Sequence, residues 1–256
     1  MQFQRTEQLL GREALSRIRR AFVVVVGLGA VGGMACEALA RAGIGRLRLV
    51  DHDTIRPSNL NRQILAVRDT IGRKKTEVAE NRIRSIAPDC RIETLDAFVH
   101  ADTLEQVLAG GPDVVIDAID SLNPKIELVA ELIRRNQTAI SSMGAALRID
   151  PTKIRIGDLA DITHCPLASF LRKRLRRRGI EPHISCVYSS EETRLLHRDA
   201  VFPPDETEVH VQKQGRRRAS LGSLPTITGI FGLTAAHWVL MRFSDAAAPL
   251  QRRERL

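Results

Sequence analysis

The chain alternates between short runs of branched apolar residues and longer segments with helical spacing. Residues 6–20 have the spacing of an amphipathic helix, and a continuous β-branched run at 21–33 follows and ends in glycines. Such a run is typical of a strand buried on both faces of a parallel sheet. Helical spacing returns at 34–42, and a second apolar strand at 46–51 ends in Asp51. The opening therefore predicts an N-terminal helix followed by a strand, a glycine turn, a helix and a strand.

The same alternation continues to residue 142 and predicts an open, doubly wound sheet. Helices are expected at 74–87, 101–108 and 123–135, and strands at 90–95, 113–120 and 138–142. Beyond residue 145, two short alternating strands around a proline turn are expected within 147–159. We therefore expect an α/β fold: a mostly parallel, Rossmann-like sheet continued by antiparallel strands, with an N-terminal helix and a C-terminal helix.

The length of 256 residues fits one large domain. We expect residues 1–256 to form a single unit. Its parts are an N-terminal helix (1–20), a nucleotide-binding core (21–150) and a substrate-side elaboration (151–256). Residues 191–222 are polar and poor in large apolar side chains, which predicts a long loop.

Composition and charge narrow the class of protein. With 43% hydrophobic and 27% charged residues the chain is globular, and its net charge of +9 favours a polyanionic partner. Four cysteines without a CxxC pair argue against a structural zinc site or a disulfide framework. No secretory signal is recognisable, so we expect a cytoplasmic protein. The uncharged stretch at 224–241 is expected to be a buried helix, although its basic flanks leave a weak membrane association open.

The first candidate site is the GLGAVG motif at residues 27–32. Gly27 would permit a tight turn, Gly29 a close approach of the backbone to a ligand, and Gly32 close packing of helix on strand. The N–H groups at the start of the next helix would then face a phosphate. By itself the motif also fits an NAD site in which Asp51 binds the ribose.

The segment after Asp51 favours a nucleoside triphosphate instead. It reads VDHDTIRPSNLNRQ and supplies Arg62 among several polar groups, and a lysine pair at 74 and 75 opens the next helix. Lysines at a helix start suit a nearby anion better than they suit the helix dipole. Asp117 and Asp120, at the end of a later strand, could hold a magnesium ion against the phosphates.

Four ordered motifs, GLGAVG, LVDHDTIRPSNLNRQ, IGRKKTE and VVIDAIDS, resemble the ubiquitin-activating-type adenylyltransferase superfamily, known as ThiF/MoeB/HesA-like. The resemblance implies binding of ATP and magnesium, with a monovalent cation left open, and adenylation of a carboxylate. It implies catalytic roles for Arg62, Lys75 and Asp120, the last as metal ligand, and for Arg5 reaching into the site of the second subunit of a homodimer. The implied nucleotide-binding residues are Gly27, Gly29, Ala30, Gly32, Asp51, Asp53, Ser58, Asn59, Asn61, Arg62, Gln63, Lys75, Asp117, Asp120 and Ser121.

The second half of the chain indicates a branch of that superfamily. Sulfur-carrier activators carry two CxxC zinc pairs, which are missing here, whereas ALRIDPTKIRIGDL, ISCVYSSE and LGSLPTITGIFGLTAA resemble the tRNA threonylcarbamoyladenosine dehydratases. This resemblance implies an enzyme that adenylates the carboxylate of threonylcarbamoyladenosine beside the tRNA anticodon and cyclises it, releasing AMP and pyrophosphate. The alternatives are activation of the C-terminal glycine of a ubiquitin-like sulfur-carrier protein, and an inactive adenine-nucleotide sensor. A sulfur-transfer partner is left open.

A tRNA substrate would give the arginine-rich stretches a role. Runs of cations can follow a phosphate backbone, and aromatic residues at 4% leave few stacking platforms. The candidates are Arg172, Lys173, Arg174, Arg176, Arg177, Arg178, Arg216, Arg217 and Arg218. The other interpretation is a solvated basic surface. Cys186 could be an acceptor thiol, but a buried structural cysteine is the favoured interpretation.

Overall fold

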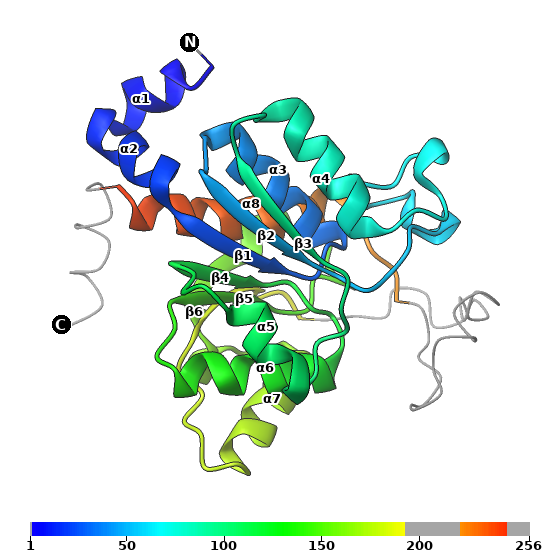
Figure 1. Cartoon of the computed structure of the whole chain (residues 1–256). Helices are drawn as coiled ribbons and strands as arrows, with labels where there is room; N and C mark the ends of the chain where they lie inside the picture. The colour runs from blue at the N-terminus through cyan, green and yellow to red at the C-terminus, as the bar shows by residue number, and fades with distance from the viewer. Residues whose placement is uncertain (1, 193–220, 245–256) are drawn as a thin grey trace.

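One seven-stranded sheet runs through the residues that the computed structural model describes, 2–192 and 221–244 (Figure 1). Its order is β3-β2-β1-β4-β5-β7-β6, with all neighbours parallel except β6 and β7. The strands are β1 (Phe22–Val26), β2 (Arg46–Val50), β3 (Arg91–Leu95), β4 (Val114–Asp117), β5 (Ala139–Ser142), β6 (Ile154–Asp158) and β7 (Ser185–Ser189). The predicted doubly wound α/β fold is confirmed.

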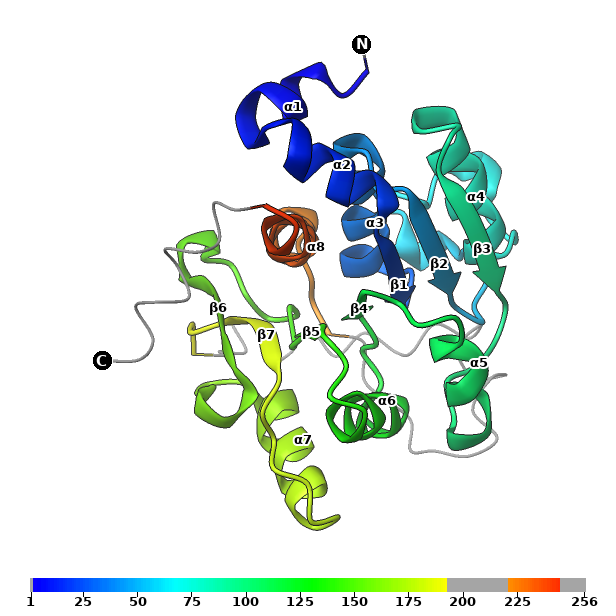
Figure 2. The same cartoon turned by 60° about the vertical axis from the view of Figure 1, so that its left-hand side comes forward.

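Helices cover both faces of the sheet, with α3, α4 and α8 on one face and α5, α6 and α7 on the other (Figure 2). The α-helices are α1 (Gln4–Leu10), α2 (Arg12–Arg20), α3 (Ala30–Ala42), α4 (Lys75–Ile86), α5 (Leu104–Leu108), α6 (Leu122–Arg134), α7 (Pro166–Arg176) and α8 (Pro225–Arg242). Short 3₁₀ turns occupy Pro57–Asn59, Arg68–Thr70, Ala101–Thr103, Pro151–Lys153 and Leu159–Asp161.

Strand β1 has no polar residue because it is covered by helices on both faces. Val23 and Val25 belong to the core under α3 and α8, whereas Phe22, Val24 and Val26 belong to the core under α5 and α6. Side chains alternate along a strand, so a strand covered on both faces needs an apolar residue at every position. Each fully buried valine contributes on the order of 1.5–3 kcal/mol.

Two predicted elements differ from the structure. The single N-terminal helix is divided at Gly11, whose φ of 89° is left-handed and lies outside a helix, so α1 and α2 are separate. Of the two strands expected within 147–159, only β6 forms. Leu147 has a φ of 60°, which is incompatible with an extended strand, and β6 pairs instead with the more distant β7. The antiparallel continuation is therefore a single edge strand.

The apolar C-terminal stretch forms α8, which packs closely against α3. A Cβ atom on Gly232 would come within 2.4 Å of the Val31 carbonyl oxygen, so only glycine allows this approach. Ile227, Phe231 and Val239 are fully buried. The predicted buried helix is confirmed, and among the described residues no helix has the length and hydropathy needed to span a bilayer. Most of the predicted 191–222 loop lies outside the described residues.

Candidate nucleotide-binding site

The glycine turn lies where the carboxyl ends of β1 and β4 meet, the point at which the strand order reverses. Gly27 has a φ of 91°, and a Cβ on it would lie 2.8 Å from the Ala118 carbonyl oxygen. A Cβ on Gly32 would lie 1.8 Å from the Gly27 carbonyl oxygen, whereas one on Gly29 would meet nothing closer than Gln63 Nε2 at 4.0 Å. Two glycines are therefore needed by the fold itself, and Gly29 leaves open space. Such switch points are where open α/β sheets bind their ligands.

Asp51 holds the glycine turn in place from the end of β2. Its carboxylate accepts hydrogen bonds from the backbone N–H groups of Leu28 at 2.6 Å and Asp53 at 2.8 Å. Asp51 is buried, as expected for a group that fixes two loops at once. Each carboxylate oxygen can accept more than one hydrogen bond, so ribose binding stays a prediction alongside this observed contact.

Lys75, at the start of α4, brings a buried cation to the same edge. It is only 5% exposed, and its Nζ lies 2.8 Å from Asp53 Oδ2 and 3.8 Å from Asp51 Oδ2. Burial by itself would raise the pKa of Asp53, but the charge and hydrogen bond of Lys75 outweigh burial and hold that pKa below its ordinary value. Asp51, His52 and Asp53 could in principle chelate a metal, but the Lys75 ammonium already partners this cluster.

The segment between β2 and α4 folds back over the glycine turn. Arg62 Nη1 donates to the Ser58 carbonyl at 2.9 Å and to Asn61 Oδ1 at 2.8 Å, so its guanidinium is held by its own loop. Asn59 Oδ1 accepts from the Arg56 N–H at 3.1 Å. Gln63 is buried, and its Oε1 has no hydrogen-bond partner. An orphaned buried acceptor beside open space at Gly29 fits a site that is completed by a polar ligand such as a nucleotide.

The two carboxylates at the end of β4 differ sharply. Asp117 is fully buried and pairs with Lys125 Nζ at 2.6 Å, and it accepts from Ser141 Oγ at 2.6 Å and from the Ile119 N–H at 3.1 Å. It therefore serves as an internal brace for the turn that follows, and not as the accessible ligand that the sequence suggested. Asp120 is exposed beyond that turn, next to Ser121.

The arginine-rich segment forms the end of α7 and the turn after it, and its members are not equivalent. Arg172 Nη1 donates to the carbonyls of Leu159 and Ile162 at 3.0 and 2.7 Å, and Arg178 pairs with Glu127. Both guanidinium groups therefore have partners within the chain. That of Arg172 is half-buried, whereas the Arg178–Glu127 pair lies at the surface, where an ion pair contributes little to stability. The exposed cations of the segment that make no ion pair with a described residue are Lys173, Arg174, Arg176 and Arg177, and Arg178 is exposed as well. Arg216, Arg217 and Arg218 lie outside the described residues.

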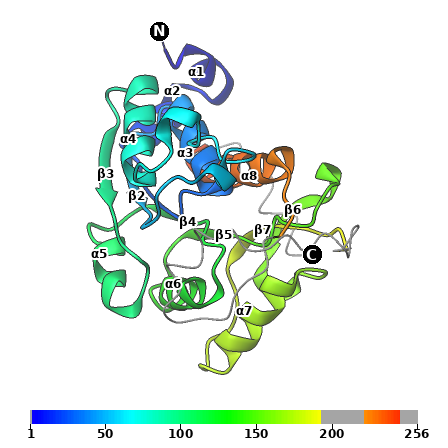
Figure 3. The same cartoon turned by 90° about the vertical axis from the view of Figure 1, so that its right-hand side faces the viewer.

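Arg5 is exposed on α1, far from α7, at the opposite end of the molecule (Figure 3). Its helix precedes the amino end of β1 through α2, whereas the glycine turn follows the carboxyl end. No described contact joins Arg5 to the candidate site of its own chain. Cys186 is fully buried, and burial raises the pKa of its thiol far above the ordinary value, which supports the structural interpretation.

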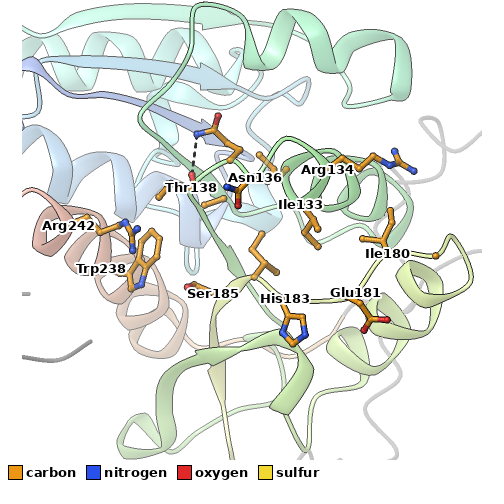
Figure 4. A pocket seen from close by; sticks show the side chains of 15 residues that line it. Ile133, Arg134, Asn136, Thr138, Ile180, Glu181, His183, Ser185, Trp238 and Arg242 are labelled. Atoms are coloured by element: carbon orange, nitrogen blue, oxygen red, sulfur yellow. Dashed lines mark hydrogen bonds between the residues drawn. The ribbon is translucent and has the colours of Figure 1, made fainter. Parts of the chain in front are cut away.

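A separate cavity of about 600 Å³ lies at the opposite edge of the sheet (Figure 4). Its lining comes from the end of α6 and the chain leading into β5, from the chain leading into β7, which includes Glu181 and His183, and from Trp238 and Arg242 of α8. The Arg242 guanidinium lies 4.6 Å from the centre of the Trp238 ring. Because these are the amino ends of parallel strands, the cavity is not part of the glycine-turn site.

Sequence reasoning missed two buried cations near the candidate site: Lys125, which pairs with Asp117, and Arg148. Arg148, in the loop after β5, is 2% exposed, and its Nε and Nη1 have no hydrogen-bond partner. The only signal in the sequence is an arginine between apolar neighbours in ALRID, which a strand prediction explains equally well.

Comparison with known proteins agrees with this geometry. The ThiF family model matches residues 3–254. The chain is 36% identical to the tRNA threonylcarbamoyladenosine dehydratase of Bacillus subtilis, over 95% of both chains, and 38% identical to that of Escherichia coli, over 95% of this chain and 93% of the other. The crystal structure of the E. coli enzyme in complex with ATP superposes with a TM-score of 0.83, at 36% identity, covering 97% of this chain and 96% of that one. The chain therefore belongs to the ThiF family, among its tRNA threonylcarbamoyladenosine dehydratases.

Proposed function

We propose that the protein is an ATP-dependent dehydratase that cyclises the threonylcarbamoyl group of adenosine beside the tRNA anticodon. The observation that carries the proposal is the end-to-end similarity to dehydratases, including an ATP-bound structure, together with a glycine turn, Gln63 and Lys75 arranged at one sheet edge. The match extends through the second half of the chain, which is where the sulfur-carrier activators would differ. That favours the tRNA substrate over a sulfur-carrier protein.

In the proposed reaction a carboxylate oxygen of the threonylcarbamoyl group attacks the α-phosphorus of ATP, and pyrophosphate leaves. The carbamoyl group then attacks the acyl carbon within the same side chain, AMP leaves, and a proton is released. The ring closes intramolecularly, so no nucleophile from the protein is required. Lys75 and Arg62 would offset negative charge on the phosphates, an effect worth several kcal/mol where water is excluded. The protein's other task is to hold the reacting groups in contact.

Asp120 is the residue we propose for magnesium. A carboxylate is a hard oxygen ligand, and magnesium in nucleotide sites is commonly held by one or two carboxylates together with phosphate oxygens. Asp120 is exposed beyond the turn braced by Asp117, so its oxygens are available. Bound there, the ion would neutralise charge on the ATP phosphates.

We further propose a homodimer in which Arg5 enters the partner's nucleotide site. No residue of α1 is fully buried within its own chain. Leu10 packs partly against the core, whereas Leu9 is 83% exposed and leaves an apolar side chain for a partner to cover. Arg5→Ala and Lys75→Met should each be inactive alone. Mixing equal amounts of the two variants and allowing subunit exchange should restore about a quarter of the wild-type activity, because half of the dimers are then mixed and each mixed dimer has one intact site of two. No recovery would contradict a shared site.

The exposed cations at the end of α7 and in the turn after it are the proposed contact with the tRNA backbone. Replacing Arg174 and Arg177 by alanine should weaken binding of modified and unmodified tRNA equally, and it should lower the slope of log K against log salt by about two. An unchanged slope would assign these residues to a solvated surface. We propose that the reaction takes place in the cytoplasm, where ATP and tRNA are both found.

The function is tested by incubating purified protein with ATP, magnesium and tRNA that carries threonylcarbamoyladenosine, followed by nucleoside analysis. Appearance of the cyclic nucleoside with release of AMP supports the proposal. Arg62→Ala should reduce the rate by at least a hundredfold, which separates an enzyme from a nucleotide sensor. If ATP–pyrophosphate exchange instead required a ubiquitin-like sulfur carrier, the alternative function would hold.

A further inference from the structure

Arg148 is a buried charge that the fold leaves largely unsatisfied. A guanidinium has five N–H groups, and the three on Nε and Nη1 have no partner, while Nη2 donates to the His164 carbonyl. Leaving a buried donor unpaired is costly, and more so for a charged one. Burial also holds the pKa of Arg148 below its ordinary value. A buried group that costs stability is expected to be retained for a function, and a ligand that supplies the missing hydrogen-bond acceptors would provide one.

Arg148 lies at the carboxyl end of the parallel strands, the same end as the candidate nucleotide site. Its loop leaves the carboxyl end of β5, the edge that also carries the glycine turn after β1. The neighbouring Leu147 N–H donates to the Gly222 carbonyl at 2.9 Å, and Asn61 Nδ2 donates to the Ser223 carbonyl at 3.4 Å. Two consecutive residues therefore connect the Arg148 loop to the segment predicted to bind the phosphates.

The position of Arg148 relative to the strands indicates whether it would bind the nucleotide phosphates or the carboxylate of the second reactant. Asp51 and Lys75 lie on the β2 side of the glycine turn, whereas β5 lies two strands away on the other side of β1. A nucleotide held at Asp51 and Lys75, with its phosphates reaching Asp120 after β4, leaves the end of β5 for the second reactant. In the proposed reaction that reactant approaches as a carboxylate.

We propose that Arg148 binds the carboxylate of the threonylcarbamoyl group before it is adenylated, an inference that rests on the function proposed above. Charge-assisted hydrogen bonds from a guanidinium to a carboxylate are among the strongest in proteins and orient the bound group. The Cys165 thiol and the Glu191 carboxylate attract the Arg148 charge, but the Glu191 oxygens accept from the Ile149 and Asp150 N–H groups and make no hydrogen bond with Nε or Nη1. Nε and Nη1 are covered in this structure, so the protein must open around them. No hydrogen bond to either nitrogen has to be broken when it does.

The test compares wild type with Arg148→Met and Arg148→Lys, and uses Arg48→Met as a matched control. Arg48, in the middle of β2, is also a buried arginine, but it is paired with Glu93 of β3 and with backbone carbonyls of the α5 region. Inhibition of tRNA conversion is measured with two probes, free threonylcarbamoyladenosine and its uncharged methyl ester. Wild type should prefer the acid at least tenfold, Arg148→Met should show no preference, and Arg148→Lys should retain part of it. Arg48→Met should retain the full preference.

Thermal unfolding separates this role from a structural one. Methionine has no unpaired donors, so the unfolding midpoint of Arg148→Met should stay the same or rise, whereas that of Arg48→Met should fall. A lowered midpoint together with an intact acid preference would show that Arg148 only holds the His164 carbonyl, and would overturn the inference. Weakened competition by inorganic pyrophosphate in Arg148→Met, with the acid preference retained, would assign the arginine to ATP and also overturn it. If wild type does not convert the tRNA at all, the proposed function fails first.

Discussion

Substitution of two neighbouring glycines by alanine separates what the fold needs from what the nucleotide needs. At Gly32 the new Cβ would lie 1.8 Å from the Gly27 carbonyl oxygen, whereas real contacts are essentially never below 3.0 Å. The backbone must then move by more than 1 Å in a close-packed region, a strain on the order of 3 kcal/mol. For a chain of this size that corresponds to a fall of roughly 6–12 °C in the unfolding midpoint.

Gly29 should behave in the opposite way. It has an ordinary extended φ of −75°, and its Cβ would meet only Gln63 Nε2 at 4.0 Å. The free energy of unfolding of Gly29→Ala should therefore stay within about 1 kcal/mol of wild type, since the gain from a less flexible unfolded chain opposes a poorer helix cap. The added methyl group would project into the space assigned to ATP.

The assay combines thermal unfolding with calorimetric titration of a non-hydrolysable ATP analogue. Gly29→Ala should keep the wild-type midpoint and raise the Kd for the analogue at least tenfold, which is about 1.4 kcal/mol. Gly32→Ala should lose stability whether or not nucleotide is present. A Gly29→Ala protein that binds the analogue as tightly as wild type would refute the assignment of this turn to the nucleotide.

Three further substitutions probe buried or half-buried charges, two at the site and one, Glu37, on α3. Lys125→Met should cost about 3–5 kcal/mol in denaturant unfolding, because it leaves Asp117 buried without its cation, and a loss under 1 kcal/mol would contradict the brace. Glu37→Gln should destabilise at pH 7. Burial by itself would raise the pKa of Glu37, but Arg82 and Arg41 hold that pKa below its ordinary value of 4.5. The stability that Glu37 contributes is therefore present above pH 4.5 and is lost as the pH falls through the lowered pKa. A difference in stability between Glu37→Gln and wild type that persists in acid would contradict this. Lys75→Met should fold and lose at least a hundredfold in turnover, and near-normal turnover would remove it from the site.

The central fold could be predicted because its signals are local. An uninterrupted apolar run such as Phe22–Val26 is typical of a strand that is covered on both faces. Gly27 is required by its own positive φ and Gly32 by its contact with the Gly27 carbonyl, five residues earlier. The edge of the sheet could not be predicted in the same way. Pairing of β6 with β7 depends on residues about thirty positions apart, and the alternation at 147–150 looks like a strand until the backbone of Leu147 is known.

The candidate site was predicted only in part, for a related reason. A motif indicates which residue types gather at the carboxyl end of the sheet, but it does not indicate which of them form ion pairs or hydrogen bonds within the protein and are unavailable to a ligand. Asp117 forms an ion pair with Lys125, and Arg172 donates hydrogen bonds to two carbonyl groups. In the sequence neither residue differs from its exposed neighbours. Arg148 is the converse case, because its missing partners become apparent only when every neighbouring acceptor has been placed.

The most direct test of the central claim is a single-turnover reaction with enzyme in excess over tRNA that carries threonylcarbamoyladenosine. Nucleosides and nucleotides are quantified by mass spectrometry in the same samples. We predict that the cyclic nucleoside, lighter by one water, and AMP appear in equal amounts and only when ATP is present. An unchanged modified nucleoside in the wild-type reaction, or AMP formed without the cyclic product, would contradict the proposed function.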